Sequence, residues 1–162
     1  MAREPLVSIL IPAYNAQDWI ADTIRSALAQ TWPRTEIVIV DDGSRDDTLA
    51  LANQFAAPHV KIVASENEGA AAARNRAYAH SQGDYIQWLD ADDLLGPDKI
   101  ERQLRARREE DTERTLLSSP WAYFAYRPRR ARFDPTALWC DLKPADWLVR
   151  KMGQHLFMQT ST

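Results

Sequence analysis

Four short β-prone runs alternate with helical stretches over the first two thirds of the sequence, and this alternation constrains the fold more than any other feature. The runs cover residues 6–11, 36–40, 60–64 and 84–89. The first two are nearly continuous apolar stretches, as expected of strands that are buried on both faces of a parallel sheet. A strand followed by a helix, repeated four times, predicts a doubly wound, mostly parallel α/β sheet of the Rossmann-like type, with helices on both faces and right-handed crossovers.

The helix boundaries follow from apolar spacing, propensity and capping residues. Trp19 is one of the apolar side chains that recur at helical spacing after the first strand. Pro12 is expected to end that strand, and Ser44 or Asp46 to cap the second helix. The alanine-rich third stretch predicts a helix on propensity alone, and its small side chains allow close approach to a sheet or a ligand. The expected helices cover residues 17–30, 44 or 46 to about 57, 70–79, and 97 to about 110.

The sequence pattern changes beyond residue 111, so we divide the chain into residues 1–110 and 111–162. The second part is rich in aromatic residues, and the chain ends without a capping residue or a polar tail. We therefore expect the sheet to be incomplete at its C-terminal end, and an uncovered apolar face to favour self-association. The elements expected here are one or two strands within 116–126, a helix at 144–152 and the start of a strand at 156–159.

Composition excludes several classes of protein. A net charge of −3 gives no reason to expect binding to bulk nucleic acid. The single cysteine, Cys140, excludes an intramolecular disulfide and a multi-cysteine zinc site. No apolar run approaches the roughly 18 residues of a membrane span, so we expect a cytoplasmic protein. Peripheral contact with a membrane stays open, because the basic residues 127–132 would suit an anionic surface, although a solvated loop is the simpler interpretation.

Every candidate functional residue lies in a loop that directly follows a predicted strand. These loops are residues 12–15, 41–44, 66–69 and 90–93. The carboxyl ends of parallel strands meet at one edge of the sheet, where open α/β sheets bind their ligands. We therefore expect the four loops to form a single crevice.

The last of these loops is strongly acidic. Asp90, Asp92 and Asp93 lie close together and repel one another unless a cation or a donor-rich ligand compensates their charge. A hard divalent ion prefers such oxygen ligands and often bridges carboxylates to phosphates. The alternative is a solvated acidic turn that caps the next helix.

The other loops offer groups that suit a nucleotide. Tyr14 supplies an aromatic face, and Arg74 could reach a base or a phosphate from its helix. Asp41 and Asp42, together with the acidic turn, supply acceptors for base or ribose donors. Each has a simpler interpretation: Tyr14 as an ordinary loop aromatic, the aspartate pair as a turn and helix cap, and Arg74 as a surface or ion-pairing arginine.

Taken together, residues 7–15, 36–48, 67–75 and 83–93 resemble four sequence blocks of glycosyltransferase family 2, in the family's order. The resemblance implies a GT-A fold, with a nucleotide-sugar-binding part at 1–110 and the start of an acceptor-side part at 111–162. It implies that Pro12 and Tyr14 flank the donor base, that Asp42 with Asp41 accepts hydrogen bonds from the base, and that Arg74 stands near it. Asp90 would approach the ribose, and Asp92, with Asp90 in the Asp-x-Asp motif, would bind Mg²⁺ or Mn²⁺.

The resemblance also implies a reaction. The family transfers a sugar from a nucleotide donor, here most simply a UDP-sugar, to a saccharide, lipid-linked or other hydroxyl acceptor, usually with inversion. A carboxylate base in a later acidic block normally deprotonates the acceptor. Asp134, Asp141 and Asp146 do not match that block, so the catalytic base is unidentified and the chain reads as truncated. The alternative is a module that binds a nucleotide sugar without turnover. A phosphoacceptor receiver domain and a dinucleotide-binding oxidoreductase are disfavoured, because their motifs after the first strand are missing.

Overall fold

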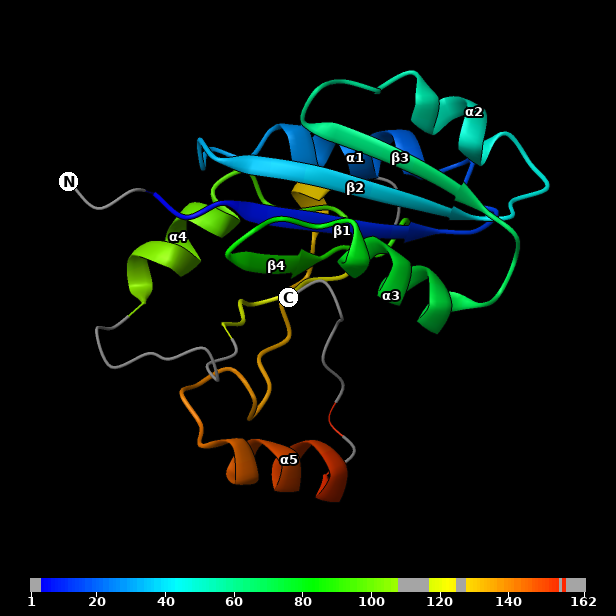
Figure 1. Cartoon of the computed structure of the whole chain (residues 1–162). Helices are drawn as coiled ribbons and strands as arrows, with labels where there is room; N and C mark the ends of the chain where they lie inside the picture. Colours follow the sequence, from blue (N-terminus) through cyan, green and yellow to red (C-terminus); the bar gives the residue numbers. More distant parts are fainter. Residues whose placement is uncertain (1–3, 108–116, 125–127, 155, 157–162) are drawn as a thin grey trace. The chain divides into compact units, whose positions relative to one another are not determined.

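The computed structural model describes residues 4–107, 117–124, 128–154 and 156 (Figure 1). The chain divides into two compact units, Met1–Arg105 and Ala106–Thr160, and each is described by itself.

The first unit is built on a parallel four-stranded sheet, as the sequence predicts. Its strands are β1 (Val7–Ala13), β2 (Thr35–Asp42), β3 (Val60–Ser65) and β4 (Tyr85–Trp88), in the spatial order β3-β2-β1-β4. The chain steps from β1 outward to β3 and then returns to place β4 on the other side of β1. The strand order therefore reverses between β1 and β4. Ligands of open α/β sheets bind beside such a switch point, beyond the carboxyl ends of the strands.

Helices cover both faces of this sheet (Figure 1). One face carries α1 (Ile20–Leu28), α2 (Thr48–Asn53) and α4 (Lys99–Ala106), and the other carries α3 (Ala70–Ala79). The bounds of α3 are those predicted, but α1 and α2 are shorter than expected at both ends. At their N-terminal ends, two loops bond to each other instead of continuing the helices: Gln17 N donates to Asp46 Oδ2 (3.2 Å) and Asp47 N to Gln17 Oε1 (3.1 Å).

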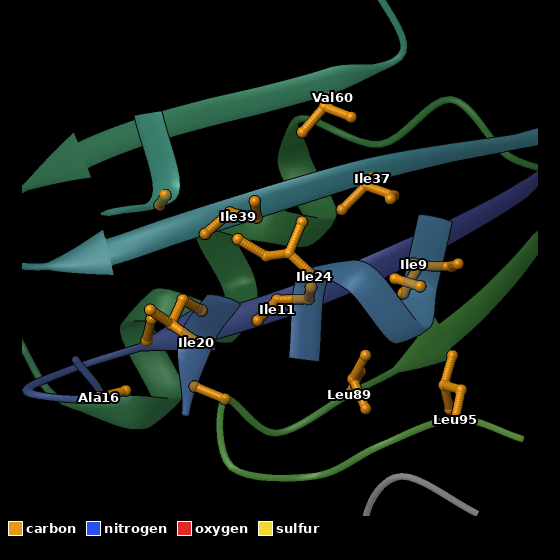
Figure 2. Packing of buried hydrophobic residues seen from close by; sticks show 14 of the residues in the cluster. Ile9, Ile11, Ala16, Ile20, Ile24, Ile37, Ile39, Val60, Leu89 and Leu95 are labelled. Carbon is orange, nitrogen blue, oxygen red and sulfur yellow. The ribbon is translucent and has the colours of Figure 1, made fainter. Parts of the chain in front are cut away.

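Branched aliphatic side chains fill the larger core, between the sheet and α1. Figure 2 shows Ile20 and Ile24 of α1 lying toward isoleucines of β1 and β2, and all of these side chains are fully buried. Burying one such side chain stabilises the fold by about 1.5–3 kcal/mol. The chain after β4 joins the same core, which fixes the position of the loop that carries the acidic residues. Its contributing residues are Leu89, Ala91, Leu95 and Ile100.

Alanines form the contact on the opposite face. Ala73 and Ala77 of α3 are buried against Leu10, Val38 and Val40 of the sheet. Because an alanine side chain is a single methyl group, α3 lies close to the strands, in agreement with the small residues of its sequence. Close packing brings the first turns of α3 next to the strand ends.

Pro12 does not end the first strand, contrary to the sequence prediction. It lies within β1, paired with Val40 of β2. Successive residues of a parallel strand bond to alternate neighbours, and the oxygen of Leu10 accepts from Leu89 N on the β4 side. The backbone of Pro12, two residues after Leu10, faces the β4 side as well. The paired residues of β1 and β4 end at Leu10 and Trp88, so Pro12 lies beyond them. The missing N–H of Pro12 therefore interrupts no ladder hydrogen bond.

Lys99 of α4 is a partly buried cation. Its Nζ donates to Gln87 Oε1 and to Gln103 Oε1, and burial lowers its pKa from 10.5 to about 8. The unfolded chain thus binds this proton more tightly than the folded chain, so folding stability rises as the pH passes from about 8 to 10.5.

We expect the free energy of unfolding of the wild type to rise by about 1–2 kcal/mol relative to Lys99→Met between pH 8 and 10. Urea unfolding curves of both proteins at the two pH values measure this difference. Parallel pH profiles would show that Lys99 titrates like an ordinary solvent-exposed lysine.

The second unit contains α5 (Pro144–Gly153) and a short 3₁₀ turn at Pro128–Arg130. The helix agrees with the one predicted. The strands expected within 116–126 are reduced, in the described residues 117–124, to a single antiparallel bridge between Tyr123 and Arg132. Trp121 packs edge-on against Trp139, with ring centroids 5.2 Å apart, which favours a packing role for both. The strand expected at 156–159 lies outside the described residues beyond Leu156, as does the end of the predicted 97–110 helix beyond residue 107.

Candidate functional site

A cavity of about 460 Å³ lies at the carboxyl ends of β1, β2 and β4. It opens where the strand order reverses, so its place in the fold is the one expected of a ligand site in an open α/β sheet. The cavity gathers side chains from loops that are far apart in the sequence. Six of the predicted site residues line it: Pro12, Tyr14, Asp42, Arg74, Asp90 and Asp92.

Asp41 does not line the cavity, unlike its neighbour Asp42. β2 continues through both residues, so their side chains project to opposite faces of the sheet. Asp42 follows the alternation of Val38 and Val40 toward α3. Asp41 points the other way and accepts a hydrogen bond from Ser44 N (3.1 Å) within its own turn. The prediction that Asp41 faces the nucleotide beside Asp42 does not agree with this geometry.

Asp42 ties the end of β2 to the start of α3. Its Oδ1 accepts from Glu68 N (3.0 Å) and its Oδ2 from Gly69 N (2.9 Å). Gly69 has a φ of +91°, a conformation that favours glycine. Each carboxylate oxygen can accept a further hydrogen bond, so Asp42 can hold α3 in place and still accept from a ligand.

The loops after β1 and β2 are bonded directly to each other. Asn15 N donates to Ser44 Oγ (3.0 Å), and Arg45 N returns a hydrogen bond to Asn15 Oδ1 (2.9 Å). Ala16 N donates to Thr48 Oγ1 (2.7 Å). Ser44 therefore caps no helix and serves instead as a partner of Asn15. This pair of loops holds Tyr14, a residue that is 46% exposed and lines the cavity.

Arg74 reaches from the second turn of α3 to the end of β4. Its guanidinium lies 2.7 Å from Asp90 Oδ1, and both side chains are partly buried. Arg74 therefore forms an ion pair, as the simpler interpretation of the sequence predicted. Both partners of this pair line the cavity. By fixing Asp90, the arginine also fixes one wall of the site.

Asp90 and Asp92 lie on one tight turn, closed by a hydrogen bond from Asp93 N to Asp90 O (3.0 Å). The pKa of Asp92 is raised because its surroundings exclude part of the solvent, and also because Asp93 and Asp90 carry like charge. A divalent cation at this turn would relieve both effects. The described residues hold no cluster of three or more His, Cys, Asp or Glu side chains placed to bind a metal ion. Asp90 and Asp92 offer carboxylate oxygens of the kind that a divalent cation prefers, and such a cation would complete its coordination with a bound ligand or water.

Sequence reasoning missed Trp19 as a site residue. It precedes α1, is 52% exposed and lines the cavity, instead of packing into the core as the helical spacing predicted. The signal that could have located it is its position, four residues after the first loop and at the N-terminal end of a helix that follows a strand. Asn67 and Ala70 also line the cavity, at the start of α3.

Residues 8–133 match the family model of glycosyl transferase family 2. The chain belongs to glycosyl transferase family 2. TuaG of Bacillus subtilis (strain 168), named as a teichuronic acid biosynthesis glycosyltransferase, is one relative of this chain. It is 44% identical over 142 residues, which cover 81% of this chain and 56% of TuaG. Chondroitin synthase of Escherichia coli is 45% identical over 103 residues, covering 62% of the chain and 15% of the synthase. The chain thus spans little more than half of the length of TuaG, and less of the synthase.

Solved structures agree with the fold of this family-2 chain. TarS of S. aureus (residues 1–349) aligns with a TM-score of 0.58 at 26% identity, covering 62% of this chain and 31% of TarS. TarS has been solved with UDP and with UDP-GlcNAc. The mannosyltransferase PcManGT of Pyrobaculum calidifontis, in complex with GDP-Man and Mn²⁺, aligns with a TM-score of 0.53 at 31% identity, covering 58% of this chain and 29% of the enzyme.

None of the helices in the described part of the chain has the length and apolar character that a membrane span requires.

Proposed function

We propose that this chain is the donor-binding part of a glycosyltransferase that transfers a sugar from a nucleoside diphosphate, UDP in the first place, to an acceptor hydroxyl. The observation that carries the proposal is the cavity, where an aromatic ring, an arginine and three carboxylates converge at the switch point of the sheet. The division into a donor part at 1–110 and an acceptor side at 111–162 belongs to this proposal. So does an acceptor that is a saccharide, a lipid-linked sugar or another hydroxyl compound.

The proposed roles follow from the position of each group in the cavity. The Tyr14 ring stacks on the base, and Pro12 at the end of β1 forms the wall beside it. Asp42 accepts from the base with the lone pairs that its two backbone N–H partners leave free. Arg74 holds Asp90 toward the ribose through their ion pair.

Asp92 and Asp90 are the residues that would hold Mg²⁺ or Mn²⁺. When bound, such an ion would neutralise the charge that develops on the departing diphosphate. Asp92 lines the cavity, and partial desolvation and the like charges of Asp93 and Asp90 raise its pKa, so a cation would stabilise its ionised form. The complex of the structural neighbour PcManGT with GDP-Man and Mn²⁺ supports a divalent metal at this site.

A second candidate, donor binding without turnover, is favoured by the carboxylates of the cavity. Asp42 accepts two backbone hydrogen bonds, Asp90 is paired with Arg74, and Asp92 is the proposed metal ligand. Each lining carboxylate thus already has a role other than that of a base. Inverting transfer needs a base that deprotonates the acceptor, and we propose that it lies in the part of the relatives that this chain does not span.

The experiment that tests the donor proposal is a calorimetric titration with UDP, GDP and TDP, with Mn²⁺ and with EDTA. We expect UDP to bind most tightly and Mn²⁺ to increase its affinity. The TarS complexes with UDP and UDP-GlcNAc support UDP, whereas the GDP-Man complex makes GDP the main competitor. A sugar-transfer assay of this chain with UDP-sugars then tests the second candidate, because product formed by these residues alone would contradict it and would place the base within them. Failure of all three nucleotides to bind would contradict both.

Tyr14→Ala should weaken UDP binding by about 1–3 kcal/mol, the range of base–aromatic stacking, and should leave the melting temperature nearly unchanged. The reason is that Tyr14 is 46% exposed and lines the cavity, so its side chain contributes little to the core. Tyr14→Phe is the matched control, which keeps the ring and should retain most of the affinity. A large drop in melting temperature with intact affinity would identify Tyr14 as a packing residue.

A further inference from the structure

Helix α1 carries a row of polar side chains on the side that meets the loop after β4. Thr23 and Ser26 of α1, and Gln30 two residues beyond its last residue Leu28, are spaced three and four residues apart, so they follow one side of the helix. Thr23 is fully buried, and the other two are half-buried. A helix that only packed on a sheet would carry apolar residues here. We call this row the polar seam.

Each member of the polar seam bonds to the acidic turn or to the chain segment that follows it. Thr23 Oγ1 donates to Ala91 O (2.8 Å). Ser26 Oγ accepts from Leu95 N (3.1 Å). Gln30 uses both ends of its amide: Nε2 donates to Gly96 O (2.8 Å), and Oε1 accepts from Ile100 N (3.3 Å). The polar seam thus bonds four backbone groups between residues 91 and 100. The segment between β4, which ends at Trp88, and α4, which begins at Lys99, contains no helix or strand.

The contact of Thr23 has the most direct consequence for the site. Ala91 lies between Asp90 and Asp92, and its carbonyl is held by a hydroxyl that is itself fully buried. The orientation of the Ala91–Asp92 peptide sets the direction in which the Asp92 side chain leaves the backbone. Asp90 is fixed separately, by its ion pair with Arg74 of α3. The two carboxylates are therefore positioned by helices on opposite faces of the sheet.

We propose that Thr23 is a positioning residue for the acidic turn: its hydroxyl, with Ser26 and Gln30 behind it, holds Asp92 in the orientation that a divalent cation and a diphosphate require. This inference rests on the proposed function, because it assigns the polar seam to the metal end of the nucleotide site. It adds a residue that touches neither ligand. A helix that holds the turn in advance removes the cost of ordering it when the ligand binds.

The test compares Thr23→Val, which removes the hydroxyl at nearly constant shape, with Thr23→Ser, which keeps it. The measured quantity is the ratio of UDP affinity in Mn²⁺ to UDP affinity in EDTA. We expect Thr23→Val to lower this ratio by about fivefold or more, the factor that one net hydrogen bond carries, with little change of affinity in EDTA. Thr23→Ser should retain most of the wild-type ratio.

Thr48→Val is the matched control, because Thr48 is also fully buried and its hydroxyl also bonds to a loop at the cavity, through Ala16 N. It should lower stability and keep the ratio. A second readout needs no ligand: hydrogen exchange at Asp93 N and Leu95 N, which are bonded to Asp90 O and Ser26 Oγ, should be faster in Thr23→Val than in Thr23→Ser.

The outcomes separate the inference from the proposed function. A wild type that binds UDP equally well in Mn²⁺ and EDTA would overturn the metal role in the proposed function, whatever the variants do. A wild type with a clear Mn²⁺ effect that Thr23→Val retains in full would overturn the inference alone and reduce Thr23 to a stabilising residue. Loss of the ratio in Thr48→Val as well would also overturn it, because the effect would then follow from general loosening of the fold.

Discussion

Replacing Asp92 by asparagine should lower the affinity for UDP in Mn²⁺ by about tenfold or more and leave the affinity in EDTA nearly unchanged. A hydrogen bond or ligand contact to a charged group is worth about 1.5–3 kcal/mol, and 1.4 kcal/mol is a factor of ten in affinity. The melting temperature should stay the same or rise slightly, because the substitution removes the repulsion of Asp92 by Asp93 and Asp90 that contributes to its raised pKa.

Asp93→Asn is the matched control for this change. It removes the same charge from the next residue, which does not line the cavity. Calorimetry in Mn²⁺ and in EDTA should show a small loss of affinity in this variant. An equal loss in the two variants would point to the general negative field of the turn instead of a metal ligand, and unchanged affinity in Asp92→Asn would contradict the metal assignment.

Asp42→Asn should be the most damaging single change at the site, because it affects both the fold and the ligand. The new amide nitrogen faces the N–H of Glu68 or Gly69, so at least one donor loses its acceptor. We expect a loss of about 1–3 kcal/mol in the free energy of unfolding, measured in urea. UDP affinity should fall by about tenfold or more in both Mn²⁺ and EDTA, because the proposed role of this residue is to bind the nucleotide base and not the metal.

Asp41→Asn separates the two effects. Asp41 is as buried as Asp42, at 2% exposure, and bonds to Ser44 N, but it projects to the opposite face of the sheet. The variant should lose stability and keep its UDP affinity. If Asp41→Asn instead lost UDP affinity as strongly as Asp42→Asn, the two aspartates would act on the nucleotide together, as the resemblance to glycosyltransferase family 2 implied.

The parallel sheet could be predicted from the sequence because buried strands leave continuous apolar runs, and the residues of the site could be located because each follows such a run. The face that each side chain takes was harder to predict. Ending the second strand at Val40 left Asp41 and Asp42 in a loop with no defined direction, whereas the strand continues and alternates through both. Extending the alternation of Leu10, Val40 and Trp88 by two residues would have assigned Pro12, Asp42 and Asp90 to one face.

The shortened helices had a different cause. Local propensity favoured helix at residues 17–19 and 54–57, but tertiary contacts prevailed. Gln17 bonds across to Asp46 and Asp47, and Ala57 pairs with Val60. Such partners are far apart in sequence or depend on a turn, so no window of residues reveals them. The polar seam could not be predicted for the same reason. In the sequence, Thr23, Ser26 and Gln30 look like ordinary exposed polar residues, and only the structure shows the loop that they bond to.

The mutual bonding of the loops after β1 and β2 has a consequence for how this chain can vary. Asn15 and Ser44 each satisfy a backbone group of the other's loop, and Asn15 adopts a φ of +49° to do so. Neither loop can then gain or lose a residue, or change either of these side chains, without leaving the other loop incomplete. Substitutions at positions 15 and 44 should therefore be tolerated as pairs more readily than singly, so that the wall of the cavity diversifies by correlated replacement and not by independent drift.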